Sequence, residues 1–171
     1  MNNINGHMEV FKNCKQFMRI INDLEGFQLL RGYKHGTSNF FKKSVRKDRR
    51  PSDTNKLVHD VMDELFYKKF KVKARSECLF VTGDYKFARG YGKTYIIYPI
   101  GPFKFYWNPD IEDLYADLPS AAYKKAPTRE ELIITLEPII KKYKSSGLKG
   151  AIRSGNEIML DCKEYYAELR E

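Results

Sequence analysis

The sequence lacks the features of a membrane, secreted or zinc-binding protein. No apolar run approaches the roughly 20 residues that span a bilayer, and the first residues lack the apolar core of a signal peptide. The three cysteines, Cys14, Cys78 and Cys162, form no CxxC pair and have no histidine at zinc-ligand spacing. We therefore expect free thiols, no metal, and a soluble cytoplasmic protein.

Length and charge set broad limits on the protein. The 171 residues are enough for one domain with a core and too few for two, so a single domain over 1–171 is expected. Lys and Arg outnumber acidic residues by 31 to 22, which gives a net charge of +9. This excess favours an anionic partner such as a nucleic acid, a phosphorylated cofactor or an acidic protein surface. The oligomeric state is left open.

Hydrophobic periodicity predicts helices mainly early in the chain and strands mainly late. Helices are expected at 9–24 within an N-terminal region 1–25, from 52 or 53 to 66, around 87–88, and from a capping box at 128–131 toward 143. Strands are expected at 27–32, 77–82, 94–100, 103–107, 157–161 and 165–169. A basic loop at 33–51 and a loop at 145–155 complete the chain. This order predicts an α+β fold with a small split sheet, mixed or antiparallel, and flanking helices.

Three short motifs place a polar side chain at the end or the start of a predicted strand. Arg31 ends the strand in LLRG, Thr82 closes the strand in FVTGD, and Glu157 opens the strand EIML. Side chains at such positions are displayed from a rigid scaffold, as catalytic groups usually are. Alone, each has an ordinary explanation: a solvated arginine, a strand threonine, and a charge on an edge strand.

Together the three motifs resemble the ADP-ribosyltransferases of the Arg–Ser–Glu type. In that family an arginine ends the first strand, a Ser or Thr closes a later strand ahead of a short helix containing alanine, and a glutamate opens a late strand. Arg31, Thr82 with Ala88, and Glu157 match this pattern in order and bracket residues 27–170. The resemblance implies an ADP-ribosyltransferase fold and a mono-ADP-ribosyltransferase activity, a glycosyl transfer that uses NAD⁺ as substrate and needs no metal.

The resemblance also implies a role for each residue. Arg31 would bind the NAD⁺ pyrophosphate with its forked guanidinium. Glu157 would hydrogen-bond the ribose 2′-hydroxyl and stabilise the oxocarbenium-like state, and Thr82 would orient Glu157 or the ribose. Further contacts with NAD⁺ are expected from Gly32, His35, Tyr91 and Tyr95.

One of these further contacts is a histidine in a predicted loop, and the others are aromatic residues or a glycine. His35 begins a His-Gly-Thr string similar to the NAD⁺-binding element of the other branch of the superfamily. It follows Arg31 by four residues and falls in a predicted loop, so a solvated histidine is the alternative. Tyr91, Tyr95 and Phe87 are candidates for stacking on nicotinamide, and the sequence does not choose among them.

The identity of the acceptor stays open. Members that modify arginine carry a second acid two residues before the glutamate, and Gly155 occupies that position here, which argues against arginine as acceptor. The segment before the glutamate sets the acceptor in this family, so acceptor-binding residues are expected at Lys149, Arg153, Gly155 and Asn156. With the basic run at 42–50, a nucleic acid remains a candidate beside a protein side chain.

Two other functions fit the same residues. One is a non-enzymatic basic module that binds nucleic acid or a host protein through charge alone. The other is an NAD glycohydrolase, with water as the acceptor. The strings RPSDT, VTGD and YPIG resemble small proteins of tailed bacteriophages, which implies a role in modifying a host, as a takeover or anti-defence factor.

Overall fold

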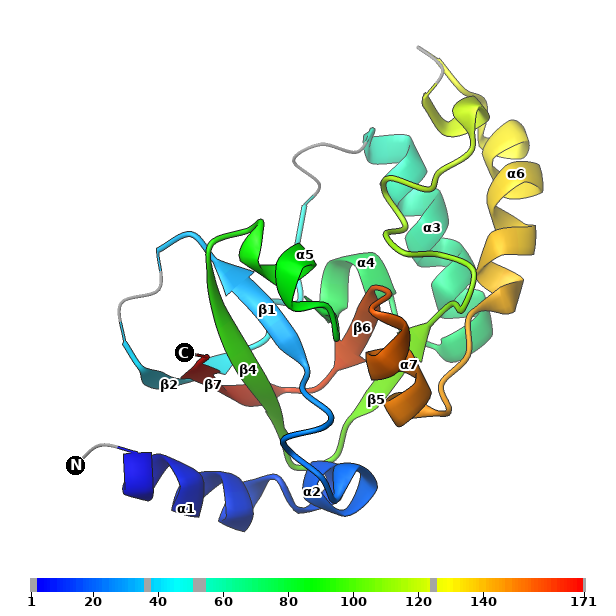
Figure 1. Cartoon of the computed structure of the whole chain (residues 1–171). Helices are drawn as coiled ribbons and strands as arrows, with labels where there is room; N and C mark the ends of the chain where they lie inside the picture. Colours follow the sequence, from blue (N-terminus) through cyan, green and yellow to red (C-terminus); the bar gives the residue numbers. More distant parts are fainter. Residues whose placement is uncertain (1–2, 36–37, 51–54, 124–125, 171) are drawn as a thin grey trace.

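The structure is a computed structural model that describes residues 3–35, 38–50, 55–123 and 126–170 (Figure 1). The described helices are α1 (Asn3–Asn13), α2 (Lys15–Ile21), α3 (Lys56–Phe70), α4 (Ala74–Glu77), α5 (Tyr85–Arg89), α6 (Arg129–Lys142) and α7 (Leu148–Ser154), with a 3-10 turn η1 (Ser120–Tyr123). The strands are β1 (Leu30–Tyr33), β2 (Phe40–Ser44), β3 (Leu79–Val81), β4 (Lys93–Ile100), β5 (Lys104–Trp107), β6 (Ile158–Asp161) and β7 (Glu164–Leu169). Ser52 and Asp53, expected at the start of the second helix, lie outside the described residues.

The strands form two antiparallel sheets. One has the order β1-β4-β7-β2 and the other the order β3-β6-β5, and all the pairings within them are antiparallel. The sheets meet where β1 passes the end of β3, because Leu30 and Thr82 exchange two backbone hydrogen bonds with N···O distances of 2.7 and 2.9 Å. The predicted α+β class is confirmed, with antiparallel rather than mixed pairing.

The three-stranded sheet is packed on both faces. On its central strand β6, Ile158 and Leu160 join an apolar cluster shared with the four-stranded sheet and with α1, α2 and α7, whereas Met159 joins a second cluster with α3 and α6. This alternation follows from the two-residue period of a strand. In Figure 1, α3 and α6 lie side by side at one end of the molecule, and α1 and α2 lie at the other. Because β6 is packed on both faces, the backbone of Glu157, which directly precedes it, is held in place.

The prediction of a loop across 33–51 is wrong for its middle part. Residues 40–44 form β2, which pairs with β7 from Phe40 opposite Glu168 to Ser44 opposite Glu164. Lys42 and Lys43 are exposed on this strand, which is the outermost of its sheet. Lysines commonly protect an edge strand from further pairing. In β2 two half-buried phenylalanines are followed by three exposed residues, so the segment lacks the apolar alternation that would predict a strand.

Two helix predictions also need correction. Residues 145–155 were expected to be a loop, but they contain α7, which lies between Gly147 and Gly155, each with positive φ. Its small residues conceal a buried face made of Leu148, Ala151 and Ile152. The helix expected at 9–24 is divided into α1 and α2 at Cys14, whose thiol faces the Tyr98 carbonyl oxygen at 3.7 Å.

Helix α4 was not predicted, and it includes Glu77, which was expected to begin the strand that starts at Leu79. The predictions for α5 and for the start of α6 agree with the structure. The capping box is confirmed, since Thr128 and Glu131 satisfy each other's backbone N–H groups at the start of α6. The short helix α5 ends at Gly90, as expected. Across the part of the chain that the structure describes, no helix is both long and apolar enough to cross a membrane.

Candidate functional site

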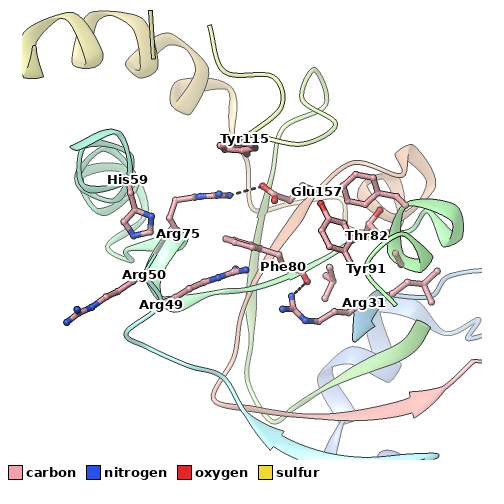
Figure 2. Close-up of a pocket in the computed structure, with 15 residues that line it drawn as sticks. Arg31, Arg49, Arg50, His59, Arg75, Phe80, Thr82, Tyr91, Tyr115 and Glu157 are labelled. Carbon is pink, nitrogen blue, oxygen red and sulfur yellow. Dashed lines mark hydrogen bonds and ion pairs between the residues drawn. The ribbon is translucent and has the colours of Figure 1, made fainter. Parts of the chain in front are cut away.

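A cavity of about 240 Å³ lies where the two sheets meet. Its lining comes from β1, α3 and α4, from β3 and α5 with the residues that follow them, from the segment before α3, from the segment after β5 that carries Tyr115, and from the residue that precedes β6 (Figure 2). Of the sequence candidates, it includes Arg31, Gly32, Thr82, Tyr91 and Glu157. Segments far apart in the chain therefore contribute to one cavity.

Backbone pairing brings the three motif residues together. Leu30 pairs with Thr82 across the junction of the sheets, so Arg31 follows directly beside Thr82. In the other direction, β3 pairs with β6 with Val81 opposite Ile158. Thr82 follows this pair on one chain segment and Glu157 precedes it on the other, and the Glu157 N–H donates to the Glu112 carbonyl oxygen at 2.7 Å. The arrangement is thus fixed by main-chain hydrogen bonds rather than by flexible side chains.

Arg31 is held in place and retains an unused donor. Its Nη1 donates to the carbonyl oxygen of Phe80 at 2.6 Å. Its guanidinium carbon lies 5.4 Å from the ring centroid of Tyr33. Among the described residues, its buried Nε has no hydrogen-bond partner. A buried donor without a partner is unfavourable, so an acceptor atom from a ligand would stabilise it.

The hydroxyl of Thr82 is engaged with the backbone around it. Its Oγ1 donates to the Gly155 carbonyl oxygen at 2.5 Å and accepts the Asp84 N–H at 3.0 Å. A threonine hydroxyl carries a single hydrogen, and here Gly155 receives it. Because Gly155 lies two residues before Glu157, Thr82 fixes the turn that leads to the carboxylate.

Glu157 is buried and paired with an arginine. Its Oε1 lies 3.2 Å from Nη1 of Arg75, and each of the two side chains is 10% exposed. Burial raises the pKa of Glu157 above its usual range, and the positive charge of Arg75 opposes this effect. The negative charge of Asp113 raises the pKa further. Arg75, the charge of Arg49 and a hydrogen bond from the Leu114 backbone therefore all favour the ionised form of the buried carboxylate.

Three arginines that the sequence motifs did not identify also line the cavity: Arg49, Arg50 and Arg75. In Figure 2, Arg75 lies above Phe80 and Arg49 below it, with Arg31 and Thr82 to the right. Arg49 and Arg50 belong to the basic run of the sequence, but nothing in that run distinguishes them from its exposed members. No sequence signal marks Arg75.

A buried network positions Arg75. Asp63 on α3 accepts the backbone N–H groups of Arg75 and Ser76 at 2.8 and 3.3 Å, and the Ser76 hydroxyl donates to the same carboxylate. His59 Nε2 lies 2.9 Å from the Ser76 hydroxyl. Although burial acts to raise the pKa of Asp63, the hydrogen bonds of His59, Ser76 and Arg75 lower it overall. Asp63 therefore anchors α4, which carries Arg75.

Aromatic side chains form part of the rim. Phe87, Tyr91 and Tyr115 line the cavity and are 39%, 52% and 37% exposed. Phe87 and Tyr91 contact each other edge to face, with ring centroids 5.5 Å apart. Of the three, only Tyr115 was not singled out by the sequence.

Gly32 allows the close approach of α5 and Tyr91 to β1. A Cβ atom at Gly32 would lie 2.1 Å from the Ala88 carbonyl oxygen and 2.8 Å from Cβ of Tyr91. The glycine at this position is thus explained by packing at the wall of the cavity.

Two residues expected to contact NAD⁺ lie outside the cavity lining. Tyr95 is fully buried on β4, where its hydroxyl donates to the Ser38 carbonyl oxygen at 3.0 Å and its ring packs against Tyr33 and Phe41. Its place in the core follows from its inward position on a strand. His35 is exposed in the turn that follows β1.

The residues expected to bind the acceptor are also not part of the lining. Lys149 and Arg153 lie on the outer side of α7, over the ring of Phe27 at 5.1 and 4.6 Å. Asn156 is buried, and its amide donates to the carbonyl oxygens of Asn108 and Pro109 at 3.0 and 3.1 Å. Gly155 ends α7 with a φ of 76°. Helix α7, which the sequence did not predict, places Lys149 and Arg153 over Phe27 and outside the lining of the cavity.

Within the described ranges, no group of three or more His, Cys, Asp or Glu side chains is placed to hold a metal ion. Comparisons with protein-family models, with curated proteins and with solved structures find no match. The cavity itself presents four arginines, one buried carboxylate and a rim of aromatic rings.

Proposed function

We propose that the chain is an NAD⁺-dependent mono-ADP-ribosyltransferase with the fold of that family, acting on a macromolecular acceptor. The observation that carries the proposal is the meeting of Arg31, Thr82 and Glu157 at one cavity. They come from distant parts of the sequence and are joined through the pairing of β1, β3 and β6. Residues without a shared role would not be expected to meet at one cavity from such distant parts of the sequence.

Arg31 is suited to binding the pyrophosphate of NAD⁺. The Phe80 carbonyl oxygen orients its guanidinium, and its buried Nε has no partner among the described residues. A volume of about 240 Å³ lies below the usual range of pockets that enclose a whole ligand, about 300–1,000 Å³. The cavity therefore suits only part of the dinucleotide, the nicotinamide ribose with the pyrophosphate beside Arg31, and the adenosine would lie across its open side.

Glu157 is suited to stabilising the transition state. In the reaction, the bond between ribose C1′ and the nicotinamide nitrogen breaks, and its electron pair leaves with nicotinamide. The acceptor then forms a new bond to C1′ and releases a proton. An ionised carboxylate in a buried site stabilises the positive charge that develops on the ribose. Arg75, at 3.2 Å, favours this ionised form.

Thr82 acts as a positioning residue in this proposal. Its hydroxyl hydrogen is donated to the Gly155 carbonyl oxygen, so it holds the backbone that leads into Glu157. Of the two roles that the family resemblance offers Thr82, this geometry supports the orientation of the glutamate.

The rate of NAD⁺ cleavage is expected to fall in mild acid, above the ordinary glutamate pKa of about 4.3. Burial raises the pKa of Glu157, and the reaction needs the carboxylate. Activity is therefore present above the folded-state pKa and lost as the pH falls through it. The measurement is kcat/KM for nicotinamide release across acidic and neutral pH, and an acid limb at the ordinary glutamate value would contradict the assignment.

The acceptor class can be identified with labelled NAD⁺. Wild type and Glu157→Gln are incubated with a cell lysate and NAD⁺ labelled in its adenosine part, and the products are digested with nuclease or protease. The proposal predicts label on macromolecules with wild type alone, and the digest that removes it names the acceptor. Free ADP-ribose as the sole product would indicate a glycohydrolase, and unchanged NAD⁺ would indicate a basic binding module.

A further inference from the structure

We infer that Arg49 and Arg75, organised around the ring of Phe80, form a phosphate-binding pair in addition to Arg31. A role for this site in the reaction rests on the proposed function. Its ability to bind a phosphate group rests only on the geometry and charge of the cavity, so phosphate binding can be tested without any turnover.

Phe80 holds the two guanidinium groups in a fixed relation. The guanidinium carbons of Arg49 and Arg75 lie 4.2 and 4.5 Å from the centroid of its ring, and Figure 2 shows the ring between them. A stacked guanidinium keeps its N–H groups in its own plane, where they remain able to donate to an anion. Phosphate recognition by arginine uses this planar set of donors.

The backbone ties the two arginines together. The N–H of Arg49 donates to the Ser76 carbonyl oxygen at 3.2 Å, and Ser76 directly follows Arg75 in α4. Asp63 anchors α4 by accepting hydrogen bonds from the backbone N–H groups of Arg75 and Ser76. The pair is thus organised before a ligand arrives, which lowers the entropy lost on binding.

The cavity has a large excess of positive charge. Four arginines and a single carboxylate line it. Among the described residues, no acidic side chain forms an ion pair with Arg49, and the carboxylate of Glu157 is paired with Arg75. Burial, followed by the charges of Arg31 and Arg75, lowers the pKa of Arg49 to about 10. A bound anion would relieve this repulsion.

An unused donor points to the same conclusion. Nε of Arg75 is buried and has no hydrogen-bond partner among the described residues. The Arg75 side chain is 10% exposed, so water has little access to it. Such a donor is unfavourable unless an acceptor oxygen reaches it, and a phosphate oxygen in the cavity would supply one.

Two ligands could supply the phosphate group that the site would bind. One is the pyrophosphate of NAD⁺, which would then contact both Arg31 and the Arg49–Arg75 pair. The other is a backbone phosphate of a nucleic-acid acceptor. Because Arg75 also contacts Glu157, either phosphate would lie beside the reacting ribose.

The test is a calorimetric titration of the full chain with inorganic pyrophosphate. Arg49→Gln is expected to weaken binding about tenfold or more, the effect of losing charge-assisted hydrogen bonds. Arg49 is preferred to Arg75 as the target, since removing Arg75 would leave Glu157 buried without its counter-ion. The matched control is Arg46→Gln, in the same basic run, where the side chain is 70% exposed and pairs with Asp48.

The control is expected to change the affinity by less than about twofold, because exposed ion pairs contribute little. Equal affinity of wild type and Arg49→Gln would overturn the site. An equal loss in Arg46→Gln would overturn it too, since the binding would then reflect diffuse charge.

The same variants are then titrated with NAD⁺ and with a short single-stranded oligonucleotide. Weaker NAD⁺ binding by Arg49→Gln assigns the site to the dinucleotide, and weaker oligonucleotide binding alone assigns it to the acceptor. If neither ligand is affected, a role for the site in the reaction is excluded. A chain that fails to cleave NAD⁺ but binds pyrophosphate through Arg49 would contradict the proposed function and retain the site.

Discussion

Replacing Glu157 with glutamine is expected to lower the rate of nicotinamide release from NAD⁺ by a factor of about 10²–10⁴, the size of effect seen when a group that acts in the transition state is removed. The amide keeps the shape of the side chain but carries no charge to stabilise the developing positive ribose. It also leaves Arg75, 3.2 Å away, without its counter-ion, so part of the folding stability is lost as well. Nicotinamide release and thermal unfolding are therefore measured on the same preparation.

The matched control for this variant is Glu168→Gln. Glu168 is also buried, with 9% of its surface exposed, but it lies on β7, where it accepts a hydrogen bond from the Tyr98 hydroxyl at 2.9 Å. We expect it to affect stability and leave the rate per folded molecule unchanged. A wild-type rate in Glu157→Gln would contradict the catalytic assignment and favour a module that binds through charge alone.

Replacing Gly83 with alanine is expected to destabilise the fold by about 3 kcal/mol or more, as in severe overpacking. An added Cβ would lie 1.8 Å from the carbonyl oxygen of Ile152 and 2.6 Å from its carbonyl carbon. Both are backbone atoms of α7, so no side-chain rotation can relieve the clash. Moving α7 would also disturb the hydrogen bond from Thr82 to Gly155. Urea unfolding gives the change in the free energy of unfolding.

Gly150→Ala is the control for this close contact. Gly150 lies on the same helix α7, and an added Cβ would meet no atom within 4 Å. Alanine is favoured over glycine in a helix by about 1 kcal/mol, so this variant is expected to be at least as stable as wild type. If Gly83→Ala also unfolds like wild type, the end of β3 does not approach α7 as described, and the support for Glu157 would have to be revised.

Most of the strands could be predicted from the sequence because they are buried and bounded by turn residues. The run from Thr94 to Ile100 is rich in β-branched and aromatic residues, which favours a strand, and the run from Glu157 to Asp161 has an apolar centre between two charged residues. They appear as β4 and β6. The pairing of the strands could not be predicted from the sequence, because β4 and β5 are neighbours in sequence but belong to different sheets.

The missed elements carry weak local signals. Strand β2 shows charged residues to solvent, and only its pairing with β7 makes it a strand. Helix α7 is short and flanked by glycines that also occur in loops. In both cases the tertiary environment, rather than local propensity, determines the structure.

The three motif residues that line the cavity lie at or next to strand ends. Arg31, Thr82 and Glu157 each stand beside a glycine or at the edge of an apolar run, so the sequence marks them. Arg49 and Arg75 reach the cavity through contacts with Phe80 and through the anchoring of α4 by Asp63. Such contacts between distant segments leave no periodic pattern in the sequence.

The proposed function requires that this cavity cleave NAD⁺ between ribose and nicotinamide. The most direct measurement is the release of label from NAD⁺ carrying its label in the nicotinamide ring, with purified wild-type chain in the presence of both protein and nucleic-acid acceptors. Release of free nicotinamide that requires Glu157 is the expected result. Intact NAD⁺ after prolonged incubation with folded protein and both kinds of acceptor would contradict it.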